Sequence, residues 1–435
     1  MKHLGRFSFT ALIILFLTAG LCYGQSAPNQ HWVKGVEFAA QEKFNEAKGE
    51  FGKVSKGDPY YETTKRALKV IKDVTDKKIK SETAIYIFQG IEYSLKEQHE
   101  QSISNLTKAI EINPRYADAY FFRGKAYGRK GQHDKAISDY NNTIEINPKY
   151  AYAYNNRGNA FADKGQHDKA IFDYNNAIEI NPKYAYAYNN RGYAYANKGQ
   201  HDKAISDYTK AIEIDPRFAM AYYNRGSAYA NKDQHDKAIS DYNKAKDIDP
   251  RFAMAYYNRG NAYYDKGLYG KAISDYTKAI EIDPKFAIAY NNRGNAYVDK
   301  GQHDKAISNY NKAIDIDPRF AMAYYNRGRA YAGKGQYDNA ISDYNNAIEM
   351  NPRDTLAYNN RGNAFADKGQ HDKAISDYNK AIDIDPKFAM AYNNRGIAYE
   401  ANGNIKQACS DWKTACALGD CSNWGVVNKI RCFRK

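Results

Sequence analysis

Cysteine and tryptophan are scarce in this sequence, and several common catalytic motifs are missing from it. Its 435 residues include five cysteines and three tryptophans. The metalloprotease motif HExxH, the nucleophile elbow GxSxG and the haem-attachment motif CxxCH do not occur, so nothing indicates those chemistries. The segment GRAYAGKG at 328–335 approximates a phosphate-binding loop, but Gly335 stands where Ser or Thr is required and no strand precedes it. We therefore expect no enzymatic activity and no cofactor.

Long apolar stretches are confined to the N-terminus. The run 7–21 follows a short basic region, is too short to span a bilayer comfortably and precedes small residues, which is typical of a cleaved signal peptide. We predict a signal peptide at 1–24, cut after Gly24, and hence an exported chain, periplasmic or secreted, without a transmembrane segment. A retained membrane anchor is one alternative. Another is a lipid anchor at Cys22, which Leu21 disfavours.

Proline is also sparse, with eleven in the chain, yet most of the prolines recur at a fixed spacing. The periodic prolines, each 34 residues after the previous one, are Pro114, Pro148, Pro182, Pro216, Pro250, Pro284, Pro318, Pro352 and Pro386. A period between 20 and 50 residues indicates a solenoid, in which each repeat packs only on its neighbours. The period therefore predicts one repeat array in place of the two or three globular domains that this length would suggest.

Residues 151–184 illustrate the repeating unit. Apolar residues recur at helical spacing in two segments, separated by the sequence DKGQHDKA. Gly165 is suited to the left-handed conformation that ends a helix, and Asp168 is expected to cap the next one. Pro182 cannot extend the second helix and marks the turn into the following unit. Each unit is thus predicted to be a helical hairpin that needs neighbours to bury its apolar face.

This unit resembles the tetratricopeptide repeat. The residues that carry the resemblance in 151–184 are Tyr154, Gly158, Phe161, Ala170, Tyr174, Ala177 and Pro182. Ten consecutive units fit the pattern in phase, with starts at residues 83, 117, 151, 185, 219, 253, 287, 321, 355 and 389. The resemblance implies an all-α fold, a right-handed superhelical solenoid of stacked helix-turn-helix hairpins, and a role as a protein–protein interaction scaffold.

The pattern also predicts the domain organisation. A divergent N-terminal repeat at 28–61 is followed by an extra amphipathic helix at 62–82. The ten repeats occupy 83–422, and a capping helix with disulfides at 421–435 is expected to cover the exposed end of the stack.

Four cysteines remain after removal of the signal peptide, and an even number in an exported protein favours disulfides. They are Cys409, Cys416, Cys421 and Cys432. If 405–418 and 421–434 pair antiparallel, Cys409 faces Cys432. In the same arrangement Cys416 faces Cys421, so we predict two nested disulfides. Cys409 and Cys416 lie about 10 Å apart on one helix, beyond disulfide reach. A zinc site is the alternative, although no close CxxC pair is present.

The net charge of +14 is basic, but acids and bases are interleaved within the repeats. The excess gathers in the tail at 389–435, which favours an acidic partner there over a nucleic acid along the groove. The Arg before the repeat glycine is followed sixteen residues later by Asp in almost every unit, as in Arg157 and Asp173, which predicts an ion pair within the hairpin; beside Arg293 the acid is replaced by Asn309. The recurrent histidines, which Tyr269 and Tyr337 replace in two repeats, are too far apart to share a metal ion.

A row of asparagines is the least expected feature, because Asn is unfavourable inside a helix by about 0.5–0.7 kcal/mol relative to Ala. The asparagines at position 6 of successive repeats are Asn156, Asn190, Asn224, Asn258, Asn292, Asn326, Asn360 and Asn394. In the tetratricopeptide family this helix face lines the concave groove, and the row is similar to the asparagine ladder of O-linked N-acetylglucosamine transferase. The resemblance implies an Asn- and Tyr-lined groove with few charges.

Two interpretations of this asparagine row stay open. Its carboxamides offer a donor and an acceptor at every step, which suits the backbone of an extended polypeptide. They could equally bond one another and join the repeats. We predict a non-catalytic scaffold that binds a protein or peptide in the groove. The alternative is carbohydrate or cell-wall binding in the envelope, because Asn and Tyr also suit glycans.

Overall fold

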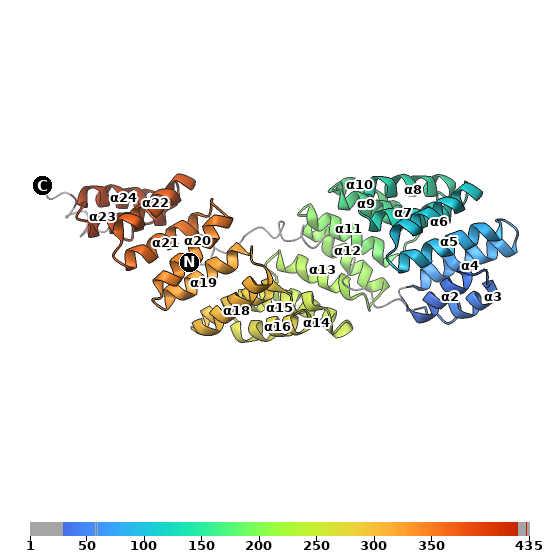
Figure 1. The fold of residues 1–435 in the computed structure, drawn as a ribbon, viewed down its shortest axis with the longest axis horizontal. Coiled ribbons are helices and arrows are strands. Elements are labelled where there is room, and N and C mark those ends of the chain that lie inside the picture. Colours follow the sequence, from blue (N-terminus) through green and yellow to red (C-terminus); the bar gives the residue numbers. More distant parts are fainter. Residues whose placement is uncertain (1–28, 57, 59, 425–431, 433–435) are drawn as a thin grey trace. The chain divides into compact units, whose positions relative to one another are not determined.

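The computed structural model describes residues 29–56, 58, 60–424 and 432. Over these residues the chain forms 23 α-helices and no strand, packed as consecutive pairs (Figure 1). The all-helical solenoid expected from the sequence is therefore confirmed. The predicted signal peptide, with Cys22 and Gly24, lies outside the described residues. None of the described helices is long and apolar enough to cross a membrane.

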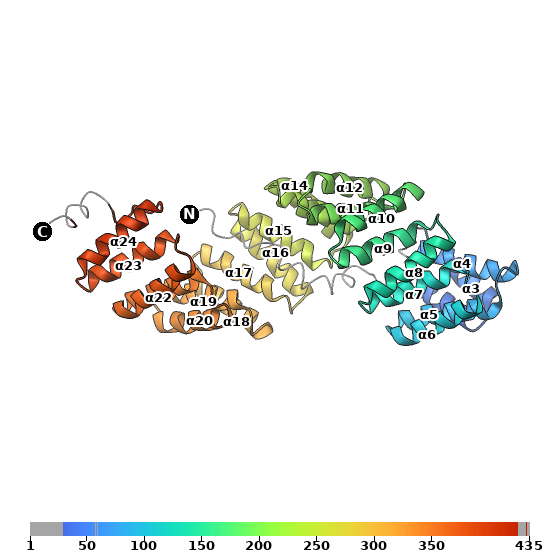
Figure 2. The same ribbon diagram turned by 90° about the horizontal axis from the view of Figure 1, so that it is seen from above.

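The chain divides into two compact units, and the first extends to Pro250. Its helices are α2 (Gln30–Ala40), α3 (Phe44–Phe51), α4 (Tyr61–Thr75), α5 (Ser81–Leu95), α6 (His99–Ile112), α7 (Ala117–Arg129), α8 (His133–Ile146), α9 (Ala151–Asp163), α10 (His167–Ile180), α11 (Ala185–Asn197), α12 (His201–Ile214), α13 (Ala219–Ala230) and α14 (His235–Ile248). Figure 2 shows the same succession of pairs from above.

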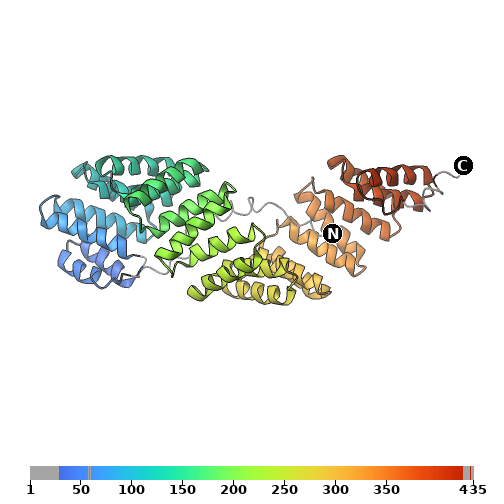
Figure 3. The same ribbon diagram turned by 180° about the vertical axis from the view of Figure 1, so that it is seen from behind.

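The second unit begins at Arg251 and contains helix pairs of the same kind. Its helices are α15 (Ala253–Asp265), α16 (Tyr269–Ile282), α17 (Ala287–Asp299), α18 (His303–Ile316), α19 (Ala321–Gly333), α20 (Tyr337–Met350), α21 (Thr355–Asp367), α22 (His371–Ile384), α23 (Ala389–Ala401) and α24 (Ile405–Ala417). They are seen from behind in Figure 3.

Within each unit the first helices of successive pairs form one continuous wall. The second helix of a pair packs on the first helix of the next, as α8 does on α9, and first helices also contact one another, as α7 does with α9 and α17 with α19. Second helices of neighbouring pairs have no contact of that extent within the described residues. Because the first helices approach more closely, each stack curves toward them, and they line its concave side.

Close packing within a hairpin depends on the repeat glycine. A Cβ added at Gly158 would lie 2.7 Å from Cε1 of Tyr174, so only glycine lets the tyrosine ring pack against the first helix. Tyr174 is 2 % exposed, and Ala170 and Ala177 beside it are fully buried. Gly165 has φ of +71° and ends the first helix, as the sequence predicted.

The capping role expected for Asp168 is wrong. Helix α10 has Gln166 at its N-cap, with no side-chain hydrogen bond there. Asp168 lies in the first helical turn instead, where its carboxylate accepts a hydrogen bond from the ammonium of Lys198 in the next repeat. An acid at this position therefore joins neighbouring hairpins.

The predicted ion pairs are confirmed and extend further than expected. Arg157 donates from Nε and Nη2 to the two carboxylate oxygens of Asp173, at 2.8 and 2.6 Å. Its Nη1 donates to Oδ1 of Asn141, on the second helix of the preceding repeat, at 2.7 Å. The guanidinium thus closes its own hairpin and ties it to the previous one.

The carboxylate in this pair is replaced in one repeat. Arg293 donates from Nε to Oδ1 of Asn309, at 2.7 Å. Burial lowers the pKa of Arg293, whereas hydrogen bonding to Asp207 raises the pKa of Arg191. Loss of the negative charge accounts for the difference between the two arginines.

The N-terminal region departs from the regular stacking. Helix α5 packs on α2, the first helix of the N-terminal hairpin, in place of the usual contact with a second helix. Helix α4 corresponds to the extra amphipathic helix predicted at 62–82, although it ends at Thr75. Its buried residues include Ala67, Val70 and Ile71, which join the core formed with Phe88.

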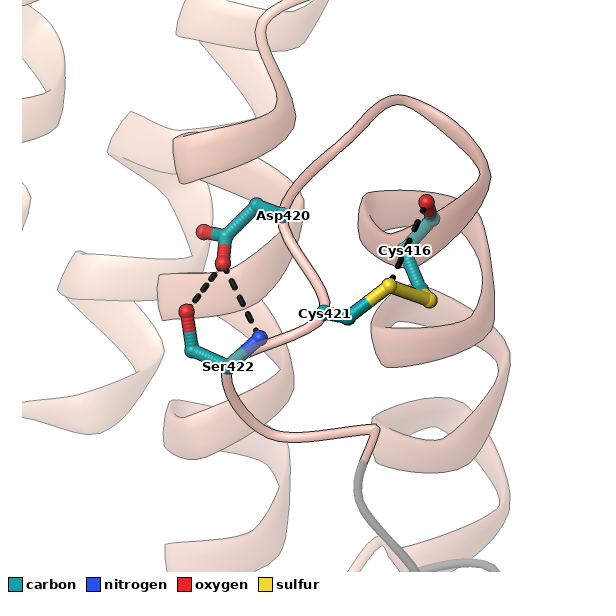
Figure 4. The surroundings of a disulfide bond; sticks show 4 residues. All are labelled: Cys416, Asp420, Cys421 and Ser422. Atoms are coloured by element: carbon teal, nitrogen blue, oxygen red, sulfur yellow. Dashed lines mark hydrogen bonds between the residues drawn. A yellow bond between two sulfur atoms is a disulfide. The ribbon is translucent and has the colours of Figure 1, made fainter.

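At the other end, disulfides join Cys409 to Cys432 and Cys416 to Cys421, the pairs expected from helix spacing. The Cα atoms of the two pairs are 5.8 and 4.0 Å apart. Figure 4 shows the second bond, beside the turn in which Asp420 accepts hydrogen bonds from Ser422. Residues 421–424 form this turn, so the predicted capping helix does not begin at Cys421. Apart from Cys432, the rest of that segment lies outside the described residues.

Candidate functional site: the inner face of the first helices

The asparagine row at position 6 lies on the inner wall, where its amides bond to the preceding repeat. Nδ2 of Asn190 donates to Oδ1 of Asn155 at 3.2 Å and to Oδ1 of Asn159 at 3.0 Å. Nδ2 of Asn224 donates to Oδ1 of Asn189 at 3.0 Å. Asn156, at the start of the row, donates to the backbone carbonyl of Tyr152 in its own helix.

The same arrangement continues in the second unit. The position-6 donors and their acceptors there are Asn292 with Tyr257 and Asn261, Asn326 with Asn291, Asn360 with Tyr325, and Asn394 with Asn359 and Asn363, at 2.9–3.1 Å. Asn258 is buried, with 5 % of its surface exposed. The position-6 amides therefore do join successive repeats, and contact with a ligand through them stays a prediction.

A second amide row, at position 9, leaves its donors available. Oδ1 of Asn159 accepts from the hydroxyl of Tyr174 at 2.8 Å, and Asn363 likewise accepts from Tyr378 at 2.7 Å. Asn295 accepts from Tyr310 at 2.8 Å. In these three residues Nδ2 makes no hydrogen bond within the described part of the chain, so two N–H donors of each amide are directed away from the tyrosine.

Sequence reasoning placed positions 6 and 9 on the same groove-lining face but named only position 6 as the binding site. A signal was present: Asn at position 9 always has Tyr fifteen residues later in the same repeat. The pairs are Asn159 with Tyr174, Asn261 with Tyr276, Asn295 with Tyr310 and Asn363 with Tyr378. In three of these pairs, Nδ2 of the position-6 asparagine in the next repeat also donates to Oδ1 of the position-9 asparagine. The two rows therefore form one hydrogen-bonded network.

Position 2 makes the inner wall more apolar than expected. This position carries Tyr186, which is 48 % exposed, and in the second unit Met322 and Met390, which are 36 % and 41 % exposed. Single exposed apolar residues are ordinary on protein surfaces. Here they occupy the same position of different repeats, beside the amides, so a ligand of this wall would meet apolar and hydrogen-bonding groups together.

The N-terminal end of the wall also carries more charge than expected. Burial, together with the charges of Arg129 and Arg66, lowers the pKa of Lys125 to about 8. Arg129 donates from Nη1 to the backbone carbonyl and the hydroxyl of Ser94. The sequence did not reveal this cluster, because Arg66 belongs to α4 and not to a repeat.

Among the described residues, no three His, Cys, Asp or Glu side chains lie close enough together to bind a metal ion. The recurrent histidines lie between neighbouring hairpins. Nδ1 of His133, for example, is 3.6 Å from a carboxylate oxygen of Asp163 in the next repeat.

Comparison with known families agrees with the helix-pair geometry. A family model described as TPR repeat matches residues 90–131, 124–165, 158–199, 260–301, 294–335, 328–369 and 362–403. A second, described as Tetratricopeptide repeat, matches 185–218 and 219–252. The chain is a tetratricopeptide-repeat protein. This tetratricopeptide-repeat protein is accordingly a protein–protein interaction scaffold, a type that takes protein or peptide partners.

Solved structures that resemble this tetratricopeptide-repeat protein include MamA, at 32% identity and a TM-score of 0.36, covering 38% of this chain and 91% of that one. YrrB, described as a TPR protein with an unusual peptide-binding site, is 29% identical with a TM-score of 0.37, covering 42% and 95%. The Cut9–Hcn1 complex is 14% identical with a TM-score of 0.47, covering 98% and 99%. No curated protein matches the sequence.

Proposed function

We propose that this tetratricopeptide-repeat protein is an exported, non-catalytic adaptor that binds an extended polypeptide along the inner face of its first helices. The observation that carries the proposal is the set of position-9 amides, in which Oδ1 is held by a buried tyrosine hydroxyl and Nδ2 is left without a partner. Export rests on the N-terminal pattern of the sequence.

Backbone recognition fits such donors. An extended polypeptide presents carbonyl groups at regular intervals whatever its side chains, and each requires a donor when it leaves water. Asn159, Asn295 and Asn363 supply donors whose orientation is fixed before binding, which reduces the entropy lost on association. The position-6 amides Asn190 and Asn394 support this orientation because they donate to the same position-9 oxygens.

The proposal is tested by capture of polypeptides from the native envelope fraction, with the chain from residue 25 onward as bait. The variant Asn159→Ala/Asn295→Ala/Asn363→Ala should lose captured polypeptides about tenfold or more, since each lost hydrogen bond costs about 1 kcal/mol. The matched control is Asn176→Ala, because Asn176 bonds only to the backbone of its own second helix. Capture unchanged in the triple variant would contradict the proposal.

A second variant addresses the asparagine row at position 6. In Asn224→Ala/Asn258→Ala/Asn292→Ala we expect a lower melting temperature as well as weaker capture, because the amides of Asn224 and Asn292 join neighbouring repeats. Unchanged capture with a lowered melting temperature would show that this row has no part in binding. Competition by soluble glycans, with no effect of peptides, would favour carbohydrate binding instead.

A further inference from the structure

Helix α4 occupies part of the inner wall within the first unit. It is not a repeat helix, yet its side chains reach the first helices α7 and α9. Arg66 donates from Nη1 to Oδ1 of Asp118 at 3.4 Å, and Glu62 accepts from the hydroxyl of Tyr152 at 3.0 Å. At the other end of α4, Asp73 accepts from the hydroxyl of Tyr116 at 3.0 Å. A segment of the chain itself, helix α4, therefore occupies part of the inner wall as a bound molecule would.

The key contact of α4 is a guanidinium among aromatic rings. The central carbon of Arg66 lies 3.6 Å from the ring centroid of Tyr150 and 4.6 Å from that of Tyr152. The ring of Phe121 is 5.7 Å away. Negative ring faces and the Asp118 carboxylate together compensate the charge of this half-buried arginine. We refer to Tyr150 and Tyr152 as the first aromatic slot.

The solenoid repeats this slot one step further along. Tyr184 and Tyr186 stand 34 residues after Tyr150 and Tyr152. The centroid of the Tyr184 ring is 4.8 Å from that of Tyr152 in the first slot, and the centroid of the Tyr186 ring is 4.6 Å from that of Phe218, which directly precedes α13. We refer to Tyr184 and Tyr186 as the second aromatic slot, which continues the wall that α4 covers.

The second slot differs from the first in having no cation. No lysine or arginine of the described residues lies over either of its rings, and Tyr186 is 48 % exposed. Burial, followed by the Asp215 carboxylate, raises the pKa of Tyr186. Burial also raises the pKa of Tyr184, on which Arg66 and Glu62 act in opposite directions. The second slot is therefore open at Tyr186, with one carboxylate near that ring.

We propose that the second aromatic slot binds an arginine side chain of the partner polypeptide, in the way that the first slot binds Arg66. The inference rests on the proposed function, because it specifies a side chain of the polypeptide that the inner wall binds. Arginine suits the slot better than lysine, since its planar guanidinium stacks on rings and is more weakly hydrated. A carboxylate beside Tyr186 would be repelled by Asp215.

The probes are two blocked peptides with the sequence of residues 61–75, one unchanged and one with Arg66→Gln. Their affinities for the full chain are measured by calorimetry. We expect the arginine peptide to bind about tenfold more tightly, the range of a partly desolvated cation–π contact. Equal affinities would contradict arginine binding in the second aromatic slot but would leave the proposed adaptor function unaffected. If neither peptide binds while the full chain still captures polypeptides, the slot is overturned and the adaptor stands; if capture is absent as well, both fail.

Variants of the protein locate the effect. Tyr186→Phe keeps the ring and should keep the preference for arginine, whereas Tyr186→Leu should abolish it. Asp215→Asn should reduce the preference severalfold, and the fold tolerates this change because Asn181 occupies the same place one repeat earlier, where it likewise accepts from a backbone N–H. A preference that survives Tyr186→Leu but disappears in Tyr150→Leu would mean that the peptide displaces α4 from the first slot, and would overturn the proposal.

Discussion

The N-terminal region and the regular repeats of this tetratricopeptide-repeat protein are stabilised in different ways. From α2 to α5 the core consists of large apolar side chains, including Trp32, Phe51 and Phe88, each at most 1 % exposed. In the repeats the buried side chains are mainly alanine and tyrosine, accompanied by polar groups such as Asp173 at 1 % exposure. A core of hydrogen-bonded groups requires fixed geometry, which explains why the 34-residue phase is kept so strictly there.

The inner wall differs between the same two regions. Near the N-terminus α4 covers it and places Arg66 among aromatic rings. Further along, amides and exposed tyrosine or methionine side chains are left for other molecules. The N-terminal end of the stack is thus irregular and apolar, and the polar repeats carry the surface on which the proposed function depends.

The largest expected effect comes from removing one charge in a repeat. Asp173→Ala leaves Arg157 half-buried without its carboxylate, which should lower the free energy of unfolding by about 3–5 kcal/mol. Asp173→Asn should cost less, because Asn309 already stands at this position beside Arg293. Urea unfolding of both variants measures the difference. Equal losses would show that the charge of the side chain matters and that its shape and remaining hydrogen bond do not.

A glycine-to-alanine change should have opposite signs in the two regions. Gly158→Ala brings a Cβ to 2.7 Å from the ring of Tyr174 and is expected to cost about 1–3 kcal/mol. Gly49→Ala, in α3, meets nothing within 4 Å and should stabilise the N-terminal hairpin by about 0.5–1 kcal/mol. Thermal unfolding of the two variants provides the test. Destabilisation in both would contradict the contrast in packing.

Falling pH should destabilise the N-terminal region before it destabilises the regular repeats. Hydrogen bonds from Lys53 and His31 lower the pKa of Glu50 to about 2, so the stability that this carboxylate provides above its ordinary pKa is lost as pH falls. Burial raises the pKa values of Asp173 and Asp343. The folded state therefore binds those protons more readily than the unfolded state, and falling pH favours folding at these sites.

Hydrogen exchange between pH 5 and about pH 3 should accordingly show α2 and α3 opening before α9 and α10, by a small margin. Intrinsic exchange rates at each pH serve as the reference. Earlier opening of α9 and α10 would mean that acid sensitivity is governed by protonation of the buried aspartates, which removes their ion pairs.

Contacts within one helical hairpin were predictable from the sequence, and contacts that depend on how separate hairpins or helices pack together were not. The pairing of Arg157 with Asp173 follows from their fixed spacing in a hairpin. The role of Asp168 was mistaken because local capping rules cannot include Lys198, which only stacking brings near. The docking of Arg66 against Tyr150 joins segments that share no period, so no pattern in the sequence indicates it.

The asparagines show an intermediate case. Their helix face was predictable from helical spacing, but the choice between bonding a ligand and bonding each other depends on distances of a few tenths of an ångström. Asn190 and Asn159 could be assigned only once the neighbouring hairpin was placed.

The reach of each guanidinium into the preceding hairpin has a consequence for how such a chain changes in evolution. Arg157 meets Asn141, Arg191 meets Asn175 and Arg225 meets Thr209, all at the same place in the previous repeat. Loss or duplication of a whole 34-residue segment would leave every remaining guanidinium with an equivalent acceptor. Unequal recombination can therefore lengthen or shorten the array by one hairpin at a time without leaving a guanidinium that lacks its acceptor in the preceding repeat.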